Sequence, residues 1–121
     1  MTEKLFHCQH AAEAKSKIPN DILCSDIADF FKIFGDLTRI KILFAISEKP
    51  LCVHDLALIL GMTQSAVSHQ LKTLRHYKLV KIERDGRLVF YVIDDEHIAE
   101  ILSAGQEHLQ HKTAKRRAHD D

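Results

Sequence analysis

Two short helical segments joined by a tight turn are the feature that most restricts how this chain can fold. Residues 53–60 read as a short helix that ends at Gly61, and Thr63 is placed to cap a longer helix that runs to about Tyr77. The longer helix carries apolar residues at helical spacing, namely Val67, Leu71 and Leu74. Two helices in this arrangement predict a helix-turn-helix.

Two β-rich runs follow this pair of helices. Residues 79–84 and 88–93 are rich in β-branched and apolar side chains, and they flank Asp85-Gly86, a strong signal for a hairpin turn. A hairpin in this position forms the wing of a winged helix. We therefore predict a mainly α fold with a two-stranded β-wing, that is, an α+β winged helix-turn-helix.

Two amphipathic helices are predicted before this motif. Residues 22–34 form the first, which closes at Gly35. Asp36 is placed to cap the second, over residues 37–47, and Pro50 stops it. Their predicted buried faces are Ile27, Phe30, Phe31 and Phe34 in the first helix and Ile40, Leu43, Phe44 and Ile46 in the second.

A last helix is predicted from about Asp95 to His111, with Asp94 as its N-cap. Its apolar stripe consists of Ile98, Ile101, Leu102 and Leu109. The first twenty residues read as an arm or a short first helix.

Composition supports one mainly helical domain. A chain of 121 residues can bury one modest core, and four Gly and two Pro argue against a loop-rich fold. Three widely spaced Cys suit reduced thiols or metal ligands better than a disulfide framework. No apolar run is long enough to span a membrane, and residues 1–6 lack the pattern of a signal peptide, so we expect a cytoplasmic protein with no membrane partner.

The formal net charge of zero hides two oppositely charged segments. Residues 62–93 carry a net charge of +4, from Lys72, Arg75, Lys78, Lys81, Arg84 and Arg87 against Glu83 and Asp85. Residues 94–111 carry five acidic groups and neither Lys nor Arg. A basic segment beside an acidic, His-bearing one predicts two surfaces with different partners.

These motifs together resemble the ArsR/SmtB family of metal-responsive repressors. The resemblance covers roughly residues 22–111 and rests on Phe34-Gly35-Asp36-Leu37-Thr38-Arg39-Ile40-Lys41-Ile42-Leu43, Pro50-Leu51-Cys52-Val53-His54-Asp55-Leu56-Ala57, Gln64-Ser65-Ala66-Val67-Ser68-His69-Gln70-Leu71, and Gly86-Arg87 followed by Phe90-Tyr91. It implies a homodimeric repressor that binds operator double-stranded DNA without metal and releases it when metal binds.

With this resemblance, the chain divides into three parts. Residues 1–20 are the N-terminal arm or short helix. Residues 21–111 form the winged helix-turn-helix domain with a C-terminal dimerisation helix, and the dimer is expected to form through the N- and C-terminal helices. Residues 112–121 are expected to be a basic, disordered tail.

The longer helix of the helix-turn-helix carries the side chains expected to read DNA. A recognition helix needs short polar groups that reach base edges and flanking basic groups that contact phosphates. The base-reading candidates are Gln64, Ser65, Ser68 and His69, the phosphate-contacting candidates are Lys72 and Arg75, and Arg87 beside the hairpin turn could reach an adjacent groove. The alternative is that these residues only solvate an exposed helix.

The last helix carries the first candidate metal site. His97 and His108 lie about 16 Å apart along a helix axis, so one helix cannot bring both onto one ion. Antiparallel pairing across a two-fold axis would place Asp95 and His97 of one chain against His108 and His111 of the other, with two equivalent sites per dimer. This set resembles the family's C-terminal-helix site and favours Zn(II) or Co(II). The alternative is a solvated acidic helix.

A second candidate site combines thiols and imidazoles. Cys52 and His54 lie where the resemblance implies a softer metal site, although the family usually has Cys at both positions. Cys8 of the N-terminal arm, with His10 or alternatively His7, would complete a set that suits Zn(II) and Cd(II). The alternative is that Cys52 is buried and the arm is free of metal. Cys24 is expected to serve packing.

The sequence thus predicts a metal-sensing repressor of genes for metal efflux or storage, with Zn(II) as the expected effector and Co(II) or Cd(II) as alternatives. Two other functions stay open: a winged-helix regulator that senses oxidants through Cys, and a metal-buffering protein that does not bind DNA. An enzyme is not expected, because the chain has no His-Glu-x-x-His, phosphate-loop or Gly-x-Ser-x-Gly motif.

Overall fold

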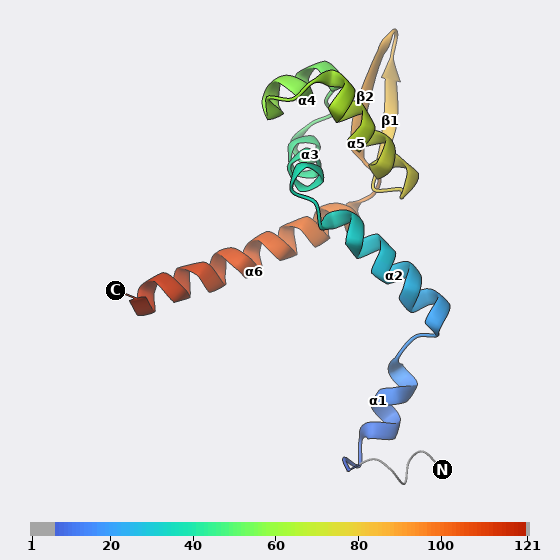
Figure 1. Ribbon diagram of the computed structural model, residues 1–121, viewed down its shortest axis with the longest axis vertical. Helices are drawn as coiled ribbons and strands as arrows, with labels where there is room; N and C mark the ends of the chain where they lie inside the picture. Colours follow the sequence, from blue (N-terminus) through green and yellow to red (C-terminus); the bar gives the residue numbers. More distant parts are fainter. Residues whose placement is uncertain (1–6, 121) are drawn as a thin grey trace. The chain divides into compact units, whose positions relative to one another are not determined.

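A computed structural model describes residues 7–120 of the chain, with side chains described for residues 7–113. The chain divides into two compact units, residues 1–32 and residues 33–121 (Figure 1). The segment 1–6, which we examined for a signal peptide, lies outside the described residues. Most side chains of the predicted basic tail, residues 112–121, also lie outside them.

The first unit consists of two helices. Helix α1 spans Ala11–Lys17, so the N-terminal segment contains a short helix rather than only an extended arm. Helix α2 spans Asp21–Phe34 and crosses into the second unit. Asn20 lies before α2, and its side-chain oxygen accepts a hydrogen bond from the Leu23 N–H at 2.9 Å, as an N-cap does.

The predicted apolar face of α2 is only partly buried within this chain. Ile33 is the buried residue of α2, whereas Ile27 and Phe31 are 41% and 53% exposed. The prediction that Ile27 and Phe31 lie in the core is therefore wrong for the single chain. Phe30 and Phe34, which share the predicted face, are half-buried.

The second unit begins with the three helices that the sequence predicts. Helix α3 spans Leu37–Glu48, α4 spans Val53–Leu60 and α5 spans Gln64–His76. The predicted N-caps of α3 and α5 are confirmed: the Asp36 carboxylate accepts from the Arg39 N–H at 3.0 Å, and the Thr63 hydroxyl oxygen accepts from the Ala66 N–H at 3.1 Å.

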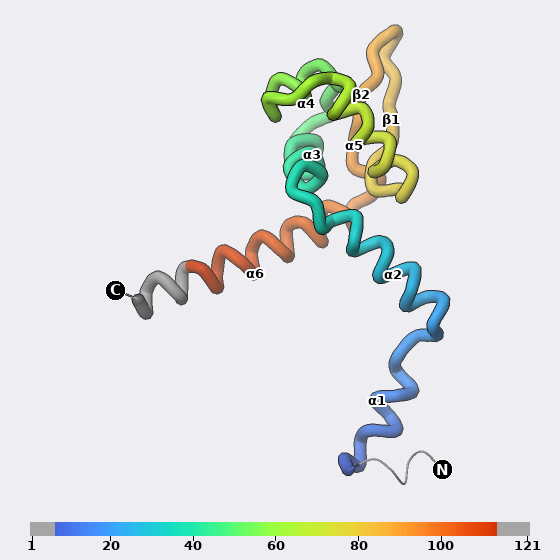
Figure 2. The backbone as a smooth tube through the Cα atoms, viewed as in Figure 1, coloured from blue at the N-terminus to red at the C-terminus, as the bar shows by residue number. Residues whose placement is uncertain are grey.

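The predicted wing is an antiparallel hairpin. Strand β1 spans Val80–Asp85 and strand β2 spans Leu88–Ile93, and Asp85 pairs with Leu88 next to the two-residue turn. Figure 2 shows the chain passing from α4 through α5 into this hairpin. A further antiparallel bridge joins Leu51 to Tyr91, so the residue before Cys52 is held on the edge of β2.

Helix α6 spans Glu96–Asp120 and so continues beyond its predicted end at His111. Its predicted N-cap is wrong by one residue. The Asp95 carboxylate, not that of Asp94, accepts a hydrogen bond from the His97 N–H at 2.8 Å. The Asp94 N–H instead donates to the Leu79 carbonyl at 3.0 Å, which ties the end of β2 to the start of β1.

The core of the second unit forms where α3, α4, α5, the hairpin and the start of α6 meet. Its members are apolar and less than a tenth exposed: Ile33, Ile42, Leu43, Ile46, Leu56, Ala57, Val67, Leu71, Leu74, Leu79, Val80, Ile98 and Leu102. The predicted apolar face of α5 is fully buried, which leaves its opposite face to solvent. None of the helices in the described part of the chain is both long and apolar enough to cross a membrane.

Candidate nucleic-acid interface and candidate metal centres

Helix α5 presents its polar residues on the side away from the core. Val67, Leu71 and Leu74 are fully buried. The predicted DNA-contacting residues of this helix are all exposed, namely Gln64, Ser65, Ser68, His69, Lys72 and Arg75. Packing thus turns the polar side of α5 outward, where it is free to enter a groove of DNA.

The turn between α4 and α5 sets the angle at which α5 leaves the core. Gly61 adopts a left-handed conformation with φ 64° and ψ 37°. The Met62 N–H donates to the Ala57 carbonyl at 3.0 Å, and the Gly61 N–H donates to the Leu58 carbonyl at 3.3 Å. This bonding satisfies the last carbonyls of α4 and reverses the chain before the Thr63 cap.

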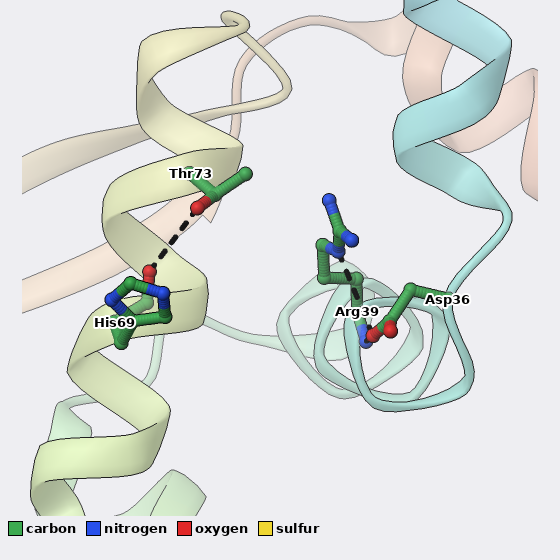
Figure 3. A network of polar contacts seen from close by, with 4 residues as sticks. All are labelled: Asp36, Arg39, His69 and Thr73. Carbon is green, nitrogen blue, oxygen red and sulfur yellow. Dashed lines mark hydrogen bonds and ion pairs between the residues drawn. The ribbon is translucent and has the colours of Figure 1, made fainter.

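Polar contacts at the base of α3 and along α5 are drawn in Figure 3. The Thr73 hydroxyl donates to the His69 carbonyl at 3.4 Å, one turn back along α5. At the start of α3, Arg39 Nε lies 3.6 Å from an Asp36 carboxylate oxygen that also caps the helix. Each contact lies within a single helix or its cap, that of Thr73 and His69 in α5 and that of Asp36 and Arg39 at the start of α3.

A cavity of about 570 Å³ lies beside the C-terminal half of α5. Its lining is His69, Lys72, Thr73, Arg75, His76 and Tyr77. The rings of His76 and Tyr77 meet edge to face at a centroid distance of 5.0 Å. The lining includes Lys72 and Arg75, the two residues of this helix that the sequence predicts to contact phosphates.

The hairpin turn carries the remaining predicted DNA contact. Gly86 has φ 61° and begins the two-residue turn, and Arg87 is its second residue. Among the described non-glycine residues only Lys78 has a positive φ, so this turn has a positive φ at its first position alone, as in a type II′ hairpin. Arg87 is exposed at the tip of the wing.

The start of α6 brings together two of the four predicted ligands of the first metal site. Asp95 Oδ1 lies 3.3 Å from His97 Nδ1, and both side chains are more than half exposed. Two ligand atoms bound to a tetrahedral Zn(II) at about 2.0 to 2.1 Å are themselves about 3.3 Å apart. The spacing of the pair is that of an ordinary ion pair and is also compatible with one edge of a zinc site.

The other two predicted ligands lie further along the same helix. His108 and His111 are exposed, and every described residue of α6 beyond Leu102 is exposed as well. Within the described part of one chain, no group of three His, Cys, Asp or Glu side chains is close enough to hold a metal ion. One chain therefore offers two of the four predicted ligands at the start of α6 and the other two further along the helix, so a single chain does not bring all four together.

The residues of the second predicted site fall in different units. Cys8 and His10 precede α1 in the first unit, and Gln9 Nε2 lies 3.2 Å from His10 Nε2. Cys52 is the N-cap residue of α4 in the second unit, and it makes no capping hydrogen bond through its side chain. All three Cys are free thiols, and the Cys24 thiol donates to the Pro19 carbonyl at 3.4 Å.

One contact of His54 was not expected from the sequence. His54 Nδ1 lies 3.1 Å from Gln64 Nε2, which joins α4 to the first residue of α5. An imidazole nitrogen has one lone pair, so Nδ1 cannot bind a metal and accept from Gln64 at once. No motif pairs these two residues; only the turn between the helices brings them together.

Sequence reasoning also missed two backbone features near the site. Lys78 follows the end of α5 and has a positive φ of 64°. Gly or Asn at this position would have predicted such a backbone, whereas Lys does not. The bridge from Leu51 to Tyr91 was missed because a single paired residue carries no alternation of apolar and polar side chains.

Comparison with known proteins agrees with this architecture. Residues 36–81 match the family described as "Bacterial regulatory protein, arsR family". The chain is 33% identical over 108 residues to a transcriptional repressor SmtB homolog of Synechocystis sp., covering 89% of this chain and 82% of that protein. It is 36% identical over 101 residues to the cadmium resistance transcriptional regulatory protein CadC of Listeria innocua, covering 83% and 84%.

A solved structure has the same fold. The homodimeric winged helix-turn-helix DNA-binding domain from Mycobacterium bovis superposes with a TM-score of 0.70 at 24% identity, covering 77% of this chain and 89% of that one. The winged helix-turn-helix prediction is therefore confirmed. Because the relatives are transcriptional regulators, the prediction that the chain is not an enzyme is confirmed too. With a matching family and a relative that shares a third of its residues over most of both lengths, the chain belongs to the arsR family of bacterial regulatory proteins.

Proposed function

We propose that this protein is a cytoplasmic, homodimeric, metal-sensing transcriptional repressor. It binds operator double-stranded DNA when metal-free, and it releases the DNA when Zn(II), or in its place Co(II) or Cd(II), binds at the dimer interface. Release derepresses genes for metal efflux or storage. The observation that carries this proposal is the pairing of Asp95 Oδ1 with His97 Nδ1 at 3.3 Å at the start of α6.

The DNA-binding part of the proposal is supported by the exposed side of α5. Its first half offers short polar groups to base edges, and its second half offers Lys72 and Arg75 to phosphates. Arg87 at the wing tip reaches a neighbouring groove or phosphate. The net charge of +4 over residues 62–93 provides the attraction for the DNA backbone, so binding weakens as salt concentration rises.

The metal-binding part rests on donor chemistry. Asp95 and His97 supply one carboxylate oxygen and one imidazole nitrogen, and His108 and His111 supply two more imidazoles. Nitrogen and oxygen donors without a thiolate favour Zn(II) and Co(II) over softer ions. Asp95 also caps α6 through the His97 N–H, so the helix start itself orients one ligand of the pair.

Dimer formation would complete this site. Because Asp95 and His97 lie at one end of the exposed α6 segment and His108 and His111 toward the other, antiparallel pairing of two α6 helices across a two-fold axis would join the halves. Exposed apolar residues provide an interface, since Ile22 of α2 is 78% exposed and Leu109 of α6 is 65% exposed. Two equivalent metal sites per dimer follow.

The second site is proposed as an addition to the first. Cys8 and His10 from one chain, with Cys52 and His54 from the other, would provide two thiols and two imidazoles once metal displaces the Gln64 contact of His54, a set that accommodates Cd(II) as well as Zn(II). The cadmium resistance regulator among the relatives favours this softer metal. Occupation of this site would raise the metal content from two to four ions per dimer.

Metal would act on DNA binding through the relative position of the two recognition helices. A dimer binds two half-sites only if its α5 helices are about one helical turn of DNA apart. If metal favours a dimer geometry with another spacing, operator affinity falls by the coupling factor, which in allosteric proteins is about 5-fold to 150-fold.

Fluorescence anisotropy tests the proposal directly. An operator is first selected by the metal-free protein from labelled duplexes with a randomised central segment, and its affinity is then measured with chelator and with saturating Zn(II). We expect Zn(II) to weaken binding by the factor above. His97→Ala should keep the metal-free affinity and lose the response, whereas Glu100→Ala, a control on the same helix, should keep both. Unchanged affinity at saturating Zn(II) would refute metal sensing.

A further inference from the structure

The two helices of the helix-turn-helix are joined by a side-chain hydrogen bond. His54 lies in the first turn of α4, and Gln64 is the first residue of α5. Both side chains are exposed, yet His54 Nδ1 and Gln64 Nε2 lie 3.1 Å apart. In the described part of the chain, this hydrogen bond links His54, which lies outside the recognition helix, to Gln64, a base-reading candidate on α5.

The turn geometry creates this contact. Gly61 in the left-handed conformation folds α5 back beside α4, and the Thr63 hydroxyl fixes the first turn of α5 through the Ala66 N–H. Gln64 is thereby held at the N-terminal end of α5, which is the end of a recognition helix that reaches base edges. His54 lies beside it from the opposite helix.

The chemistry of the two groups decides the direction of the hydrogen bond. A carboxamide nitrogen only donates, so Nδ1 of the imidazole accepts and the ring proton of neutral His54 is on Nε2. The Gln64 amide keeps one further N–H and its carbonyl oxygen. A donor and an acceptor side by side match the N7 acceptor and N6 donor of adenine in the major groove.

We propose that His54 is a positioning residue for DNA reading, which holds the Gln64 carboxamide so that it recognises an adenine in each half-site. This inference rests on the DNA binding of the proposed function and not on its metal response. A long Gln side chain otherwise samples several rotamers, and DNA binding must then order it at an entropic cost. The His54 contact restricts the amide before DNA arrives, so base discrimination at that position depends on a residue that touches no base.

Four proteins separate this role from a general effect on the fold: wild type, Gln64→Ala, His54→Ala and His54→Asn. The Asn variant retains a side-chain acceptor in its carbonyl oxygen, at nearly the same reach as Nδ1, and so is the conservative rescue. Asp55→Asn, exposed next to His54 on α4 and outside both the hydrogen bond and the DNA-contacting set, is the matched control. Thermal unfolding of each variant verifies that it is folded.

The readout is base preference, measured with chelator present. Each protein is mixed with labelled duplexes whose central segment is randomised, and bound sequences are counted by position. We expect wild type to prefer adenine at one position per half-site, with discrimination on the order of tenfold. Gln64→Ala and His54→Ala should lose the preference at that position alone, while His54→Asn keeps most of it.

The outcomes distinguish the inference from the proposed function. If Gln64→Ala loses the preference and His54→Ala keeps it, His54 does not position Gln64 and the inference is wrong. If Gln64→Ala leaves every position unchanged, Gln64 reads no base and the inference is again wrong. If wild type shows no sequence preference at any position, the proposed operator binding itself fails.

Discussion

Among the described residues of the second unit, three have a positive φ, and each ends or reverses an element. Gly61 closes α4, Lys78 closes α5 and Gly86 begins the hairpin turn. The two glycines adopt this region at little cost, whereas a residue with a Cβ pays a steric penalty of about 1 to 2 kcal/mol. These positions therefore link single residues to the orientation of α5 and the wing.

At the residue scale, we expect Gly61→Ala to lower the free energy of unfolding by about 1 kcal/mol. A Cβ at this position meets no atom within 4 Å, so the loss would come from the backbone conformation alone. Gly61→Asn should cost less, because Asn tolerates the left-handed region better. Urea denaturation at a fixed protein concentration measures the difference. Equal stability of the Ala variant and wild type would show that the turn does not require this conformation.

Lys78 permits the reverse experiment. Replacing it with Gly removes the Cβ from a residue with φ 64°, so we expect Lys78→Gly to raise the free energy of unfolding by about 0.5 kcal/mol, net of the extra freedom of Gly in the unfolded chain. Lys78→Ala removes the charge but keeps the Cβ and should leave stability unchanged. The two urea midpoints are compared directly, and a midpoint that falls for the Gly variant contradicts the expectation.

At the scale of elements, α5 is held from two sides. Its buried face carries Val67, Leu71 and Leu74, and its N-terminus is capped by Thr63. The buried face determines which side chains point outward, and the cap determines where the helix begins. The sequence predicted both the buried face and the start of α5, because each depends on residues that are close together along the chain.

We expect Thr63→Ala to lower the free energy of unfolding by about 1 kcal/mol, because the Ala66 N–H loses its partner. Thr63→Ser keeps the hydroxyl and should stay close to wild type. Urea denaturation reports stability, and operator affinity should fall along with it because the first turn of α5 carries Gln64 and Ser65. A Thr63→Ala protein as stable as the Ser variant would show that the cap contributes nothing.

The basic part of α5 gives a prediction about salt. Lys72 is exposed and lines the cavity beside α5, so we expect it to neutralise one phosphate per half-site. Lys72→Ala should then weaken binding to all DNA sequences and reduce the slope of log affinity against log salt concentration by about 1 per contact. Anisotropy titrations at several salt concentrations measure the slope. Lys41→Ala, an exposed Lys on α3, is the control, and equal slopes for all three proteins would exclude a phosphate contact by Lys72.

At the scale of the whole molecule, α6 makes the single chain incomplete for its proposed task. Ile98 and Leu102 pack into the core, but the described residues after Leu102 are exposed. Each predicted α6 metal site therefore needs two chains. In the proposed dimer this arrangement would couple metal binding to dimer geometry, because the ligands of one ion would come from both chains.

Mixed dimers can test this sharing of ligands. One chain carries Asp95→Ala with His97→Ala, and the other carries His108→Ala with His111→Ala. We expect neither homodimer to bind Zn(II) at the α6 site, whereas the mixed dimer regains one ion, since its unchanged halves face each other. Zinc competition titrations in a Cys8→Ser, Cys52→Ser background measure the stoichiometry without the second site. A mixed dimer that binds no Zn(II) would contradict ligand sharing.

Several parts of the molecule followed from short-range pattern. The limits of α3, α4, α5 and the hairpin agree with the prediction because caps, turn residues and apolar spacing act within a few residues. The errors arose where a choice depended on distant partners or on a small geometric preference. Asp94 and Asp95 are adjacent and equally suited to cap α6, and the Asp94 N–H is taken by Leu79 across the hairpin.

By itself the sequence determined the order of elements, the buried face of α5 and the family, and it predicted candidate residues for binding DNA or metal. Periodicity and side-chain chemistry are local properties, so they can be read from the sequence without the tertiary structure. Only the tertiary structure decided which of those residues meet. It paired Asp95 with His97 and His54 with Gln64, and it left Ile27 and Phe31 of α2 exposed, because distances between side chains depend on how helices pack and turn in three dimensions.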